Sequence, residues 1–167
     1  IFGYNWEKEK IREILIWGEE INWGKGIVLE DERIAVPFSN KIMLLNLKAG
    51  NYIINNIGEE EEEFSRILLY KENLWFIVNN KAVVIQWNYT ENCSRRIVTL
   101  PEKDNGEKVF FGRSNICQEE EMLYCFSKYG NYLIKINMEK FSVKSIVLNN
   151  PNVVELRQII NNKKNIY

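Results

Sequence analysis

The sequence predicts an all-β fold built from tandem four-stranded antiparallel units. Two short sequence markers recur along the 167 residues, and each interval between them holds about four short β-branched and aromatic segments separated by polar turns. Sustained helical periodicity is absent. Hydrophobic residues make up 46% of the chain, so a chain of this length can bury a core.

The first marker is a polar turn that leads into an apolar segment. These segments begin at Ile34, Leu74, Leu123 and Ile166, which are 40, 49 and 43 residues apart. An internal period of this size is the sequence signature of a repeat architecture.

The second marker is an apolar segment that contains an amide residue just before a polar turn. The amides are Asn5, Asn46, Gln86 and Asn137, at intervals of 41, 40 and 51 residues. Because two independent markers recur at similar intervals, we predict one repeating unit along the whole chain.

Each predicted strand is a short apolar run bounded by Asn, Gly or charged turn residues. The first complete unit is expected to have strands at Gly26–Leu29, Ile34–Phe38, Lys41–Leu47 and Asn51–Asn55. The second is expected to have them at Ser65–Tyr70, Leu74–Val78, Ala82–Trp87 and Arg95–Leu100. The third is expected to have them at Val109–Ile116, Met122–Ser127, Tyr132–Asn137 and Ser142–Leu148.

Four strands in about 40–45 residues is the period of a propeller blade. The repeat resembles the blades of kelch-, YVTN- and quinoprotein-type β-propellers, although it has neither a Trp-Asp pair nor a double glycine. The resemblance implies tandem blades, three of them complete, with partial blades at both ends. The complete blades are expected at 24–57, 64–100 and 108–148, the last two strands of a blade at 1–17, and the start of a further blade at 153–167.

Three arrangements remain open for such a set of blades. The two ends could join into a closed four-bladed ring, the chain could be a slice of a larger ring, or several copies could assemble into one. We favour the slice, because the last strand, Ile166–Tyr167, is short for a seam. An open slice is expected to self-associate through its exposed blade edges.

Charge and composition exclude several classes of function. The 22 basic residues are scattered among 23 acidic ones, which argues against a nucleic-acid partner. No apolar run approaches the roughly 18–20 residues that span a bilayer, and no signal sequence opens the chain, so we expect a cytoplasmic protein without a membrane segment. The chain has no histidine, and its three cysteines, Cys93, Cys117 and Cys125, favour a reducing compartment. Cys117 and Cys125 are expected on neighbouring strands; we read them as buried free thiols, and a bridge between them is the alternative. We therefore assign no catalytic residue, metal ligand or cofactor.

The resemblance also implies where a ligand would bind. Propellers bind ligands through the loops between second and third strands and through the loops between blades. The alternative is that Asn and Lys at these positions only form turns. The acidic run Glu59–Glu63 is read as a solvated loop between blades, and Trp75 and Trp87 as packing between blades. The candidate ligand-binding residues are Trp23, Ser39, Asn40, Lys41, Asn79, Asn80, Lys81, Tyr129 and Asn131.

The expected function is a non-catalytic binding or scaffolding module that recognises a protein, peptide or carbohydrate. One alternative is a fragment of a propeller enzyme of glycosidase, lyase or quinoprotein type, acting through carboxylates or Tyr and Arg groups at the ring centre. A further alternative is a structural repeat without a ligand. Fold by itself does not decide among them.

Overall fold

The computed structural model describes residues 2–5, 10–13, 24–78, 81, 83–98, 111–127 and 132–147. These residues form β-strands and turns and no helix, which confirms the predicted all-β class. Accordingly, this part of the chain contains no helix of the length and hydrophobicity needed to cross a membrane.

The described strands form three four-stranded sheets and one hairpin, and every pair of neighbouring strands is antiparallel. The hairpin consists of β1 (Phe2–Asn5) and β2 (Lys10–Glu13). The first sheet consists of β3 (Ile27–Val28), β4 (Ile34–Phe38), β5 (Lys41–Asn46) and β6 (Asn51–Asn56). The second consists of β7 (Phe64–Tyr70), β8 (Asn73–Val78), β9 (Val83–Asn88) and β10 (Cys93–Val98). The third consists of β11 (Phe111–Glu119), β12 (Met122–Ser127), β13 (Tyr132–Asn137) and β14 (Ser142–Val147).

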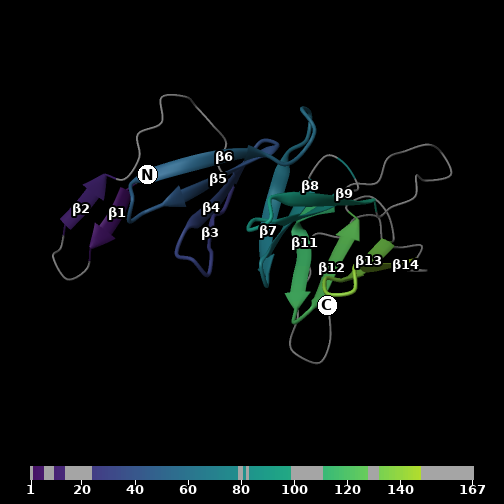
Figure 1. Cartoon of the computed structure of the whole chain (residues 1–167). Helices are drawn as coiled ribbons and strands as arrows, with labels where there is room; N and C mark the ends of the chain where they lie inside the picture. Colours follow the sequence, from purple (N-terminus) through teal and green to yellow (C-terminus); the bar gives the residue numbers. More distant parts are fainter. Residues whose placement is uncertain are drawn as a thin grey trace.

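Within each sheet the strands follow chain order, so the prediction of four-stranded antiparallel units is confirmed. Each sheet is open, with its first and fourth strands at the two edges. Figure 1 shows the three sheets in succession, from the first sheet in blue to the third in green. The first strands of neighbouring sheets lie close together, since β7 contacts both β3 and β11.

The two middle strands of the second sheet, β8 and β9, are buried on both faces. Every residue from Leu74 to Val78 is buried, and successive side chains point in opposite directions. Leu74 and Phe76 belong to a core shared with the first sheet, whereas Trp75 and Ile77 belong to a core shared with the third. The first sheet contributes Leu29, Ala35, Ile42 and Leu44, and the third contributes Phe111, Ile116, Leu123, Cys125, Ile134, Ile136 and Met138.

The two tryptophans predicted to pack between units lie in these cores. Trp75 is fully buried and its ring stacks on that of Phe141, with 5.9 Å between centroids. Trp87 is buried in the other core, with its ring centroid 6.4 Å from that of Phe76. The prediction of inter-sheet packing is therefore confirmed for both. The remaining tryptophans lie outside the described residues.

The turn between third and fourth strands has the same construction in each sheet. The side-chain Oδ1 of Asn46 accepts hydrogen bonds from the amides of the second and third residues that follow it. Asn88 and Asn137 do the same, at 2.7–3.1 Å. Such a turn needs a short side chain that can fold back on its own backbone, which explains the recurrence of Asn.

This construction corrects one of the sequence markers. In the second sheet the amide that builds the turn is Asn88, not Gln86. Gln86 is buried inside β9, where its Nε2 donates to Oδ1 of Asn73 on the neighbouring strand. The marker failed at this position because two amide residues lie within three positions of each other, and the one that builds the turn is Asn88, which has the shorter side chain and ends β9.

The hairpin β1–β2 repeats the register of these third and fourth strands. Asn5 pairs with Lys10, with four residues between them, as Asn46 pairs with Asn51 and Asn137 with Ser142. β1 and β2 therefore correspond by register to third and fourth strands.

Left-handed residues also recur at equal positions. Glu32, Lys71 and Glu120 have φ values of 65°, 52° and 49°, and each lies two residues before a second strand. Asn92 and Phe141, with φ of 53° and 54°, directly precede a fourth strand. The repeat is therefore one of backbone conformation as well as of hydrophobicity.

Replacing Asn137 by Ala is expected to lower the free energy of unfolding by about 1–2 kcal/mol, because two amide hydrogen bonds lose their acceptor. Urea unfolding of the variant measures the change. Asn56→Ala, at an exposed position in β6, is the matched control and should change stability by less than about 0.5 kcal/mol. An equal loss in both variants would contradict a special role for the Asn137 side chain.

Candidate functional site

Loops predicted to form a ligand-binding face meet at one end of the first two sheets. The turn Ser39–Asn40 joins β4 to β5, and the segment 57–63 joins β6 to β7. The amides of Ile57 and Gly58 donate to the carbonyl of Asn40 at 3.0 and 2.9 Å, and the amide of Phe64 donates to the carbonyl of Ser39 at 3.0 Å. We call this region the loop end; it holds the turn Ser39–Asn40, the segment 57–63 and Lys81.

Glu62 fixes the loop end to the second sheet. Its carboxylate is buried and accepts two hydrogen bonds from the guanidinium of Arg96 in β10, at 3.1 and 2.5 Å. The same carboxylate also accepts a hydrogen bond from the backbone amide of Glu59 at 2.8 Å. A bidentate pair of this kind is both strong and directional. The prediction of a fully solvated acidic loop is therefore wrong for Glu62, because a cation on the adjacent sheet draws this carboxylate inward.

Gly58 leaves the space that this carboxylate occupies. A Cβ atom on Gly58 would lie 2.7 Å from Oε2 of Glu62 and 3.1 Å from the ring of Phe64. Any larger residue would therefore displace the ion pair or the ring.

Lys81 adds a second cation to the cluster. Its Nζ lies 2.8 Å from Oε2 of Glu59 and 3.6 Å from Oε1 of Glu62. Arg96 also lies 3.6 Å from Glu59. Two carboxylates and two cations thus neutralise one another, which lowers the electrostatic cost of burying Glu62.

The surroundings of Glu62 act on its pKa in opposite directions. Burial raises the pKa, whereas the hydrogen bonds from Arg96 and from the Glu59 amide, and the charges of Arg96 and Lys81, lower it. The net effect is a pKa below the ordinary 4.5, so Glu62 is ionised at neutral pH. A carboxylate held in this state serves as an anchor and not as a general acid.

The structure describes four of the nine candidate ligand-binding residues. Asn40 donates through Nδ2 to the carbonyl of Gly58 at 3.3 Å, and Lys81 is paired with Glu59, so both side chains hold the loops in place. Ser39 is exposed and Lys41 is half-buried at the same end. The other candidates lie outside the described residues: Trp23, Asn79, Asn80, Tyr129 and Asn131.

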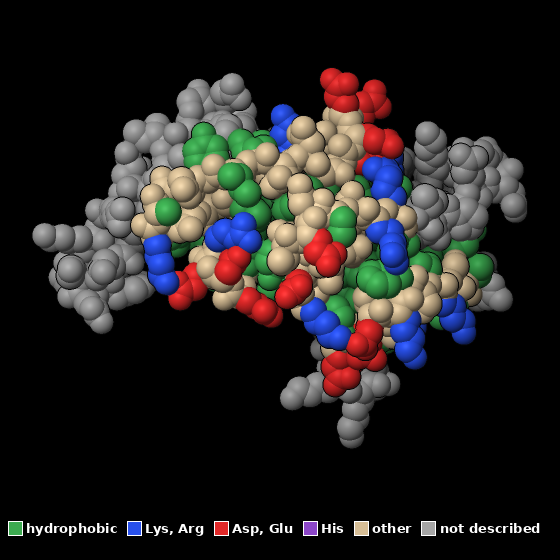
Figure 2. Space-filling model, in the orientation of Figure 1, with side chains coloured by type: hydrophobic (Ala, Val, Ile, Leu, Met, Phe, Trp, Pro, Cys, Tyr) green, Lys and Arg blue, Asp and Glu red, His purple; other side chains and the backbone are tan. Residues whose placement is uncertain are grey.

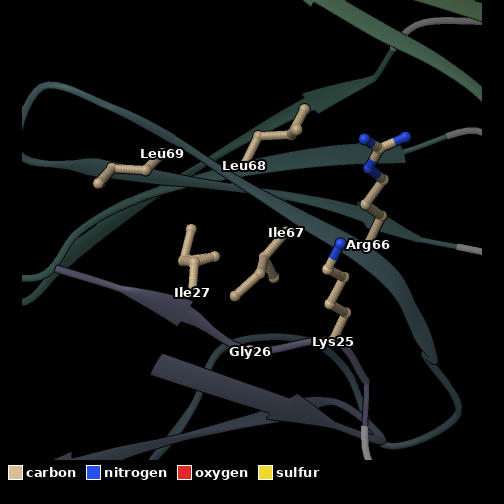
Figure 3. Close-up of a pocket in the computed structure, with 7 residues that line it drawn as sticks. All are labelled: Lys25, Gly26, Ile27, Arg66, Ile67, Leu68 and Leu69. Carbon is tan, nitrogen blue, oxygen red and sulfur yellow. The ribbon is translucent and has the colours of Figure 1, made fainter. Parts of the chain in front are cut away.

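A cavity of about 240 Å³ lies between the first strands of the first two sheets. Its lining combines apolar side chains from β3 and β7 with two cations, Lys25 and Arg66, and contains no acidic residue. Figure 3 shows both cations on one side of this space and Ile27 and Leu69 on the other. The complete lining is Lys25, Gly26, Ile27, Arg66, Ile67, Leu68 and Leu69.

Lys25 and Arg66 lie close in the chain to residues that are bonded at or near the loop end. Phe64, which begins β7, is bonded to Ser39, and Arg66 follows it by two residues. Lys25 immediately follows Gly24, whose amide donates to the carbonyl of Pro37 near the end of β4. The cavity therefore has Lys25 near the loops and apolar side chains farther along the strands.

Arg66 and its neighbours also connect the second and third sheets. Nη1 of Arg66 donates to the carbonyl of Ile116 at 3.1 Å, and Nε2 of Gln118 donates to the carbonyl of Leu69 at 3.3 Å. Arg66 is exposed, and the hydrogen bond to the Ile116 carbonyl holds its guanidinium against β11. β7 thus lies between the cavity on one side and β11 on the other.

Sequence reasoning missed Lys25 and Arg66. A signal was present for Arg66, which is the one charged residue in the predicted strand Ser65–Tyr70. Arginine is almost never fully buried without a partner, so a cation in an otherwise apolar strand marks a position open to solvent or to a polar partner. Lys25 carried no such signal, because it lies in a glycine-rich segment that resembles any turn.

The three cysteines are free thiols in the structure. Cys117 is paired in register with Tyr124, and Cys125 with Ile116, so the two thiols are not opposite each other. Burial raises the pKa of Cys125, which keeps it protonated. Among the described residues, no three His, Cys, Asp or Glu side chains form a group that could hold a metal ion.

Charge over the visible surface has no single sign. Figure 2 shows Lys and Arg side chains interspersed with Asp and Glu side chains, with hydrophobic and other atoms between them. The cavity differs from this mixed surface in that its lining contains two basic residues and no acidic one.

No protein-family model matches the chain, and no curated protein matches it. Solved structures are similar in fold. One is the extracellular domain of a protein assigned as the hybrid two-component system BT4673 of B. thetaiotaomicron, with a TM-score of 0.58 and 13% identity over 84% of this chain. A second structure, assigned as the extracellular domain of the one-component system BT4673 of that organism, gives a TM-score of 0.57 and 13% identity, also over 84% of this chain. This chain spans 18% of the length of either structure, and at 13% identity the likeness is one of fold alone.

Replacing Glu62 by Gln is expected to lower the free energy of unfolding by about 1–2 kcal/mol at pH 7, because half-exposed Arg96 loses its charged partner. The folded pKa of Glu62 is below 4.5, so the stabilisation is fully present above that pH and is lost as the pH falls through the folded value. Chemical unfolding from pH 7 to pH 3 should therefore show the two proteins converging in stability at the acid end.

Glu63→Gln is the matched control, since Glu63 is exposed in the same acidic run. It should leave stability within about 0.5 kcal/mol of the original at every pH. A Glu62→Gln deficit that persists unchanged at pH 3 would contradict the ion-pair account.

Proposed function

We propose that the three sheets are consecutive blades of a β-propeller. The successive order of the sheets, the proximity of β3, β7 and β11, and the exposed fourth strands β6 and β14 support this arrangement. The fold likeness to larger extracellular domains, of which this chain spans 18%, is consistent with a slice of a larger assembly. In this arrangement the hairpin β1–β2 supplies the third and fourth strands of a further blade.

The module is a non-catalytic binding unit for a peptide or carbohydrate chain that carries an acidic group. The observation that carries this proposal is the cavity between β3 and β7, whose lining contains Lys25 and Arg66 and no acidic residue; the guanidinium of Arg66 is bonded to Ile116 on the side of β11. The cavity volume of about 240 Å³ is below the roughly 300–1,000 Å³ usual for pockets that enclose a whole ligand. It suits a single acidic unit of a longer chain, with the remainder lying across the loops.

The loop end supports this role by being rigid. Backbone hydrogen bonds join Ser39–Asn40 to the segment 57–63, and Glu62 ties that segment to Arg96. A surface whose loops are already ordered loses less entropy on binding. Ser39 and Lys41 then provide adaptable polar contacts beside the cavity.

The alternative of a propeller enzyme requires carboxylates whose pKa values are driven apart. Glu62, the buried carboxylate of the described part of the chain, has its pKa lowered and is bonded to Arg96. An enzymatic role would therefore depend on groups other than Glu62.

The cellular location of the protein is predicted here from the sequence alone. The sequence favours the cytoplasm, whereas the similar solved structures are extracellular domains. The free thiols agree with a reducing compartment. Fractionation of the source cells with an antibody against the chain would distinguish the two locations.

The binding proposal predicts selectivity for negative charge. The acidic probes are trigalacturonic acid and an acetylated tetraglutamate peptide, and the neutral probe is maltotriose. Calorimetry at low salt should detect binding of one or both acidic probes and no binding of maltotriose. Lys25→Ala should weaken that binding about fivefold, since roughly 1 kcal/mol of charge attraction is lost.

Lys48→Ala is the control, because Lys48 is exposed in the turn after β5, at the opposite end of that strand from Ser39–Asn40. It should leave the affinity unchanged. Equal binding of acidic and neutral probes, or equal weakening by both substitutions, would overturn the proposal. Cleavage of a probe during the titration would instead support the enzyme alternative.

A further inference from the structure

The fourth strand of each unit forms an outer edge, and these edges differ in charge. β10 contains Arg95 and Arg96, and β14 contains Lys144. β2 consists largely of charged residues. β6, with the sequence Asn-Tyr-Ile-Ile-Asn-Asn, contains no charged residue.

Charged residues, prolines and bulges are the usual protection of an edge strand against pairing with another chain. β6 has none of the three. Its register with β5 runs without a break from Asn46↔Asn51 to Lys41↔Asn56, so the strand is regular over its full length. It is the last strand of its sheet, and in the part of the chain that the structure describes its strand partner is β5.

Apolar side chains are exposed along the same strand. Tyr52 is 42% exposed, Ile53 55% and Ile54 39%. A strand of β-branched and aromatic residues exposed on both faces is well suited to pairing with a further strand. Figure 1 shows β6 at the margin of the first sheet.

The sequence of β6 is nearly the same in both directions about Ile53. When two copies pair antiparallel around a two-fold axis at Ile53, Ile53 lies opposite Ile53, Tyr52 opposite Ile54, and Asn51 opposite Asn55. Aromatic–β-branched pairs are favourable cross-strand neighbours, and paired amides can bond each other. No like charges meet in this register.

The outer strands β10 and β14 contain charged residues, whereas β6 contains none. In β10 the central positions are Arg95 and Arg96, so a two-fold axis at either one places arginine opposite arginine. In β14 an axis at Lys144 opposes two lysines, whereas an axis at Ser145 opposes Lys144 to Ile146. Like charges directly opposite each other destabilise a strand pair.

We propose that β6 is a homodimerisation edge, through which two copies of this chain form a continuous eight-stranded sheet about a two-fold axis at Ile53. The contact is isologous, so it closes at two copies. It involves a single strand from each copy, and the dimer is therefore expected to be weak and reversible, with a dissociation constant in the micromolar range.

Sedimentation velocity over a range of concentrations tests the proposal. The chain should show a reversible monomer–dimer equilibrium, and Ile53→Lys should abolish it by placing two ammonium groups at the axis. Val143→Lys, a matched change of an exposed apolar residue in the outer strand β14, should dimerise as the original does. Circular dichroism should confirm that each variant is folded.

Cross-linking provides a measurement that does not depend on the lysine variant. In a Cys93→Ser background, I53C should form a disulfide-linked dimer on mild oxidation, because the two positions face each other across the axis. V143C should remain largely monomeric. A monomer at every concentration, a dimer that tolerates Ile53→Lys, or open-ended oligomers would each overturn the proposal.

Discussion

The burial of the middle strands of the second sheet, β8 and β9, on both faces is the constraint on which the rest of the structure depends. Side chains on β8 alternate between two cores, one shared with each neighbouring sheet. Because neither face meets water, the strand reads as a continuous apolar run from Leu74 to Val78 instead of an alternating one. Polar residues are consequently displaced to the ends of the strands, where the turns and the candidate site lie.

The same stacking explains why Glu62 is buried. The segment 57–63 must cross from one stacked sheet to the next, and its crossing brings a carboxylate beside Arg96 on the far edge of the second sheet. Lys81 and Arg96 neutralise the charge of Glu62 there, and these ion pairs hold the segment 57–63 against the second sheet. The apolar wall of the cavity continues the core between the first two sheets.

The sequence predicted features that follow from periodicity and failed on features that depend on partners distant in the chain. The strands Ile34–Phe38, Met122–Ser127 and Tyr132–Asn137 have the predicted bounds, because turn residues mark both of their ends. Glu62 and Glu63 are indistinguishable in a run of five glutamates, and only the position of Arg96, 34 residues later, separates them. The choice of Gln86 over Asn88 failed for a related reason, since side-chain length, not residue class, decides which amide can build the turn.

Left-handed turn residues have a consequence for stabilising the molecule. Glu32, Lys71 and Glu120 hold a backbone conformation that costs an L-residue roughly 1–2 kcal/mol, and all three are exposed. Glycine removes that cost, and its greater freedom in the unfolded chain offsets about half of it. Because the three positions are equivalent in the repeat and distant from one another in the chain, their gains should add, which offers a direct route to a more heat-resistant variant.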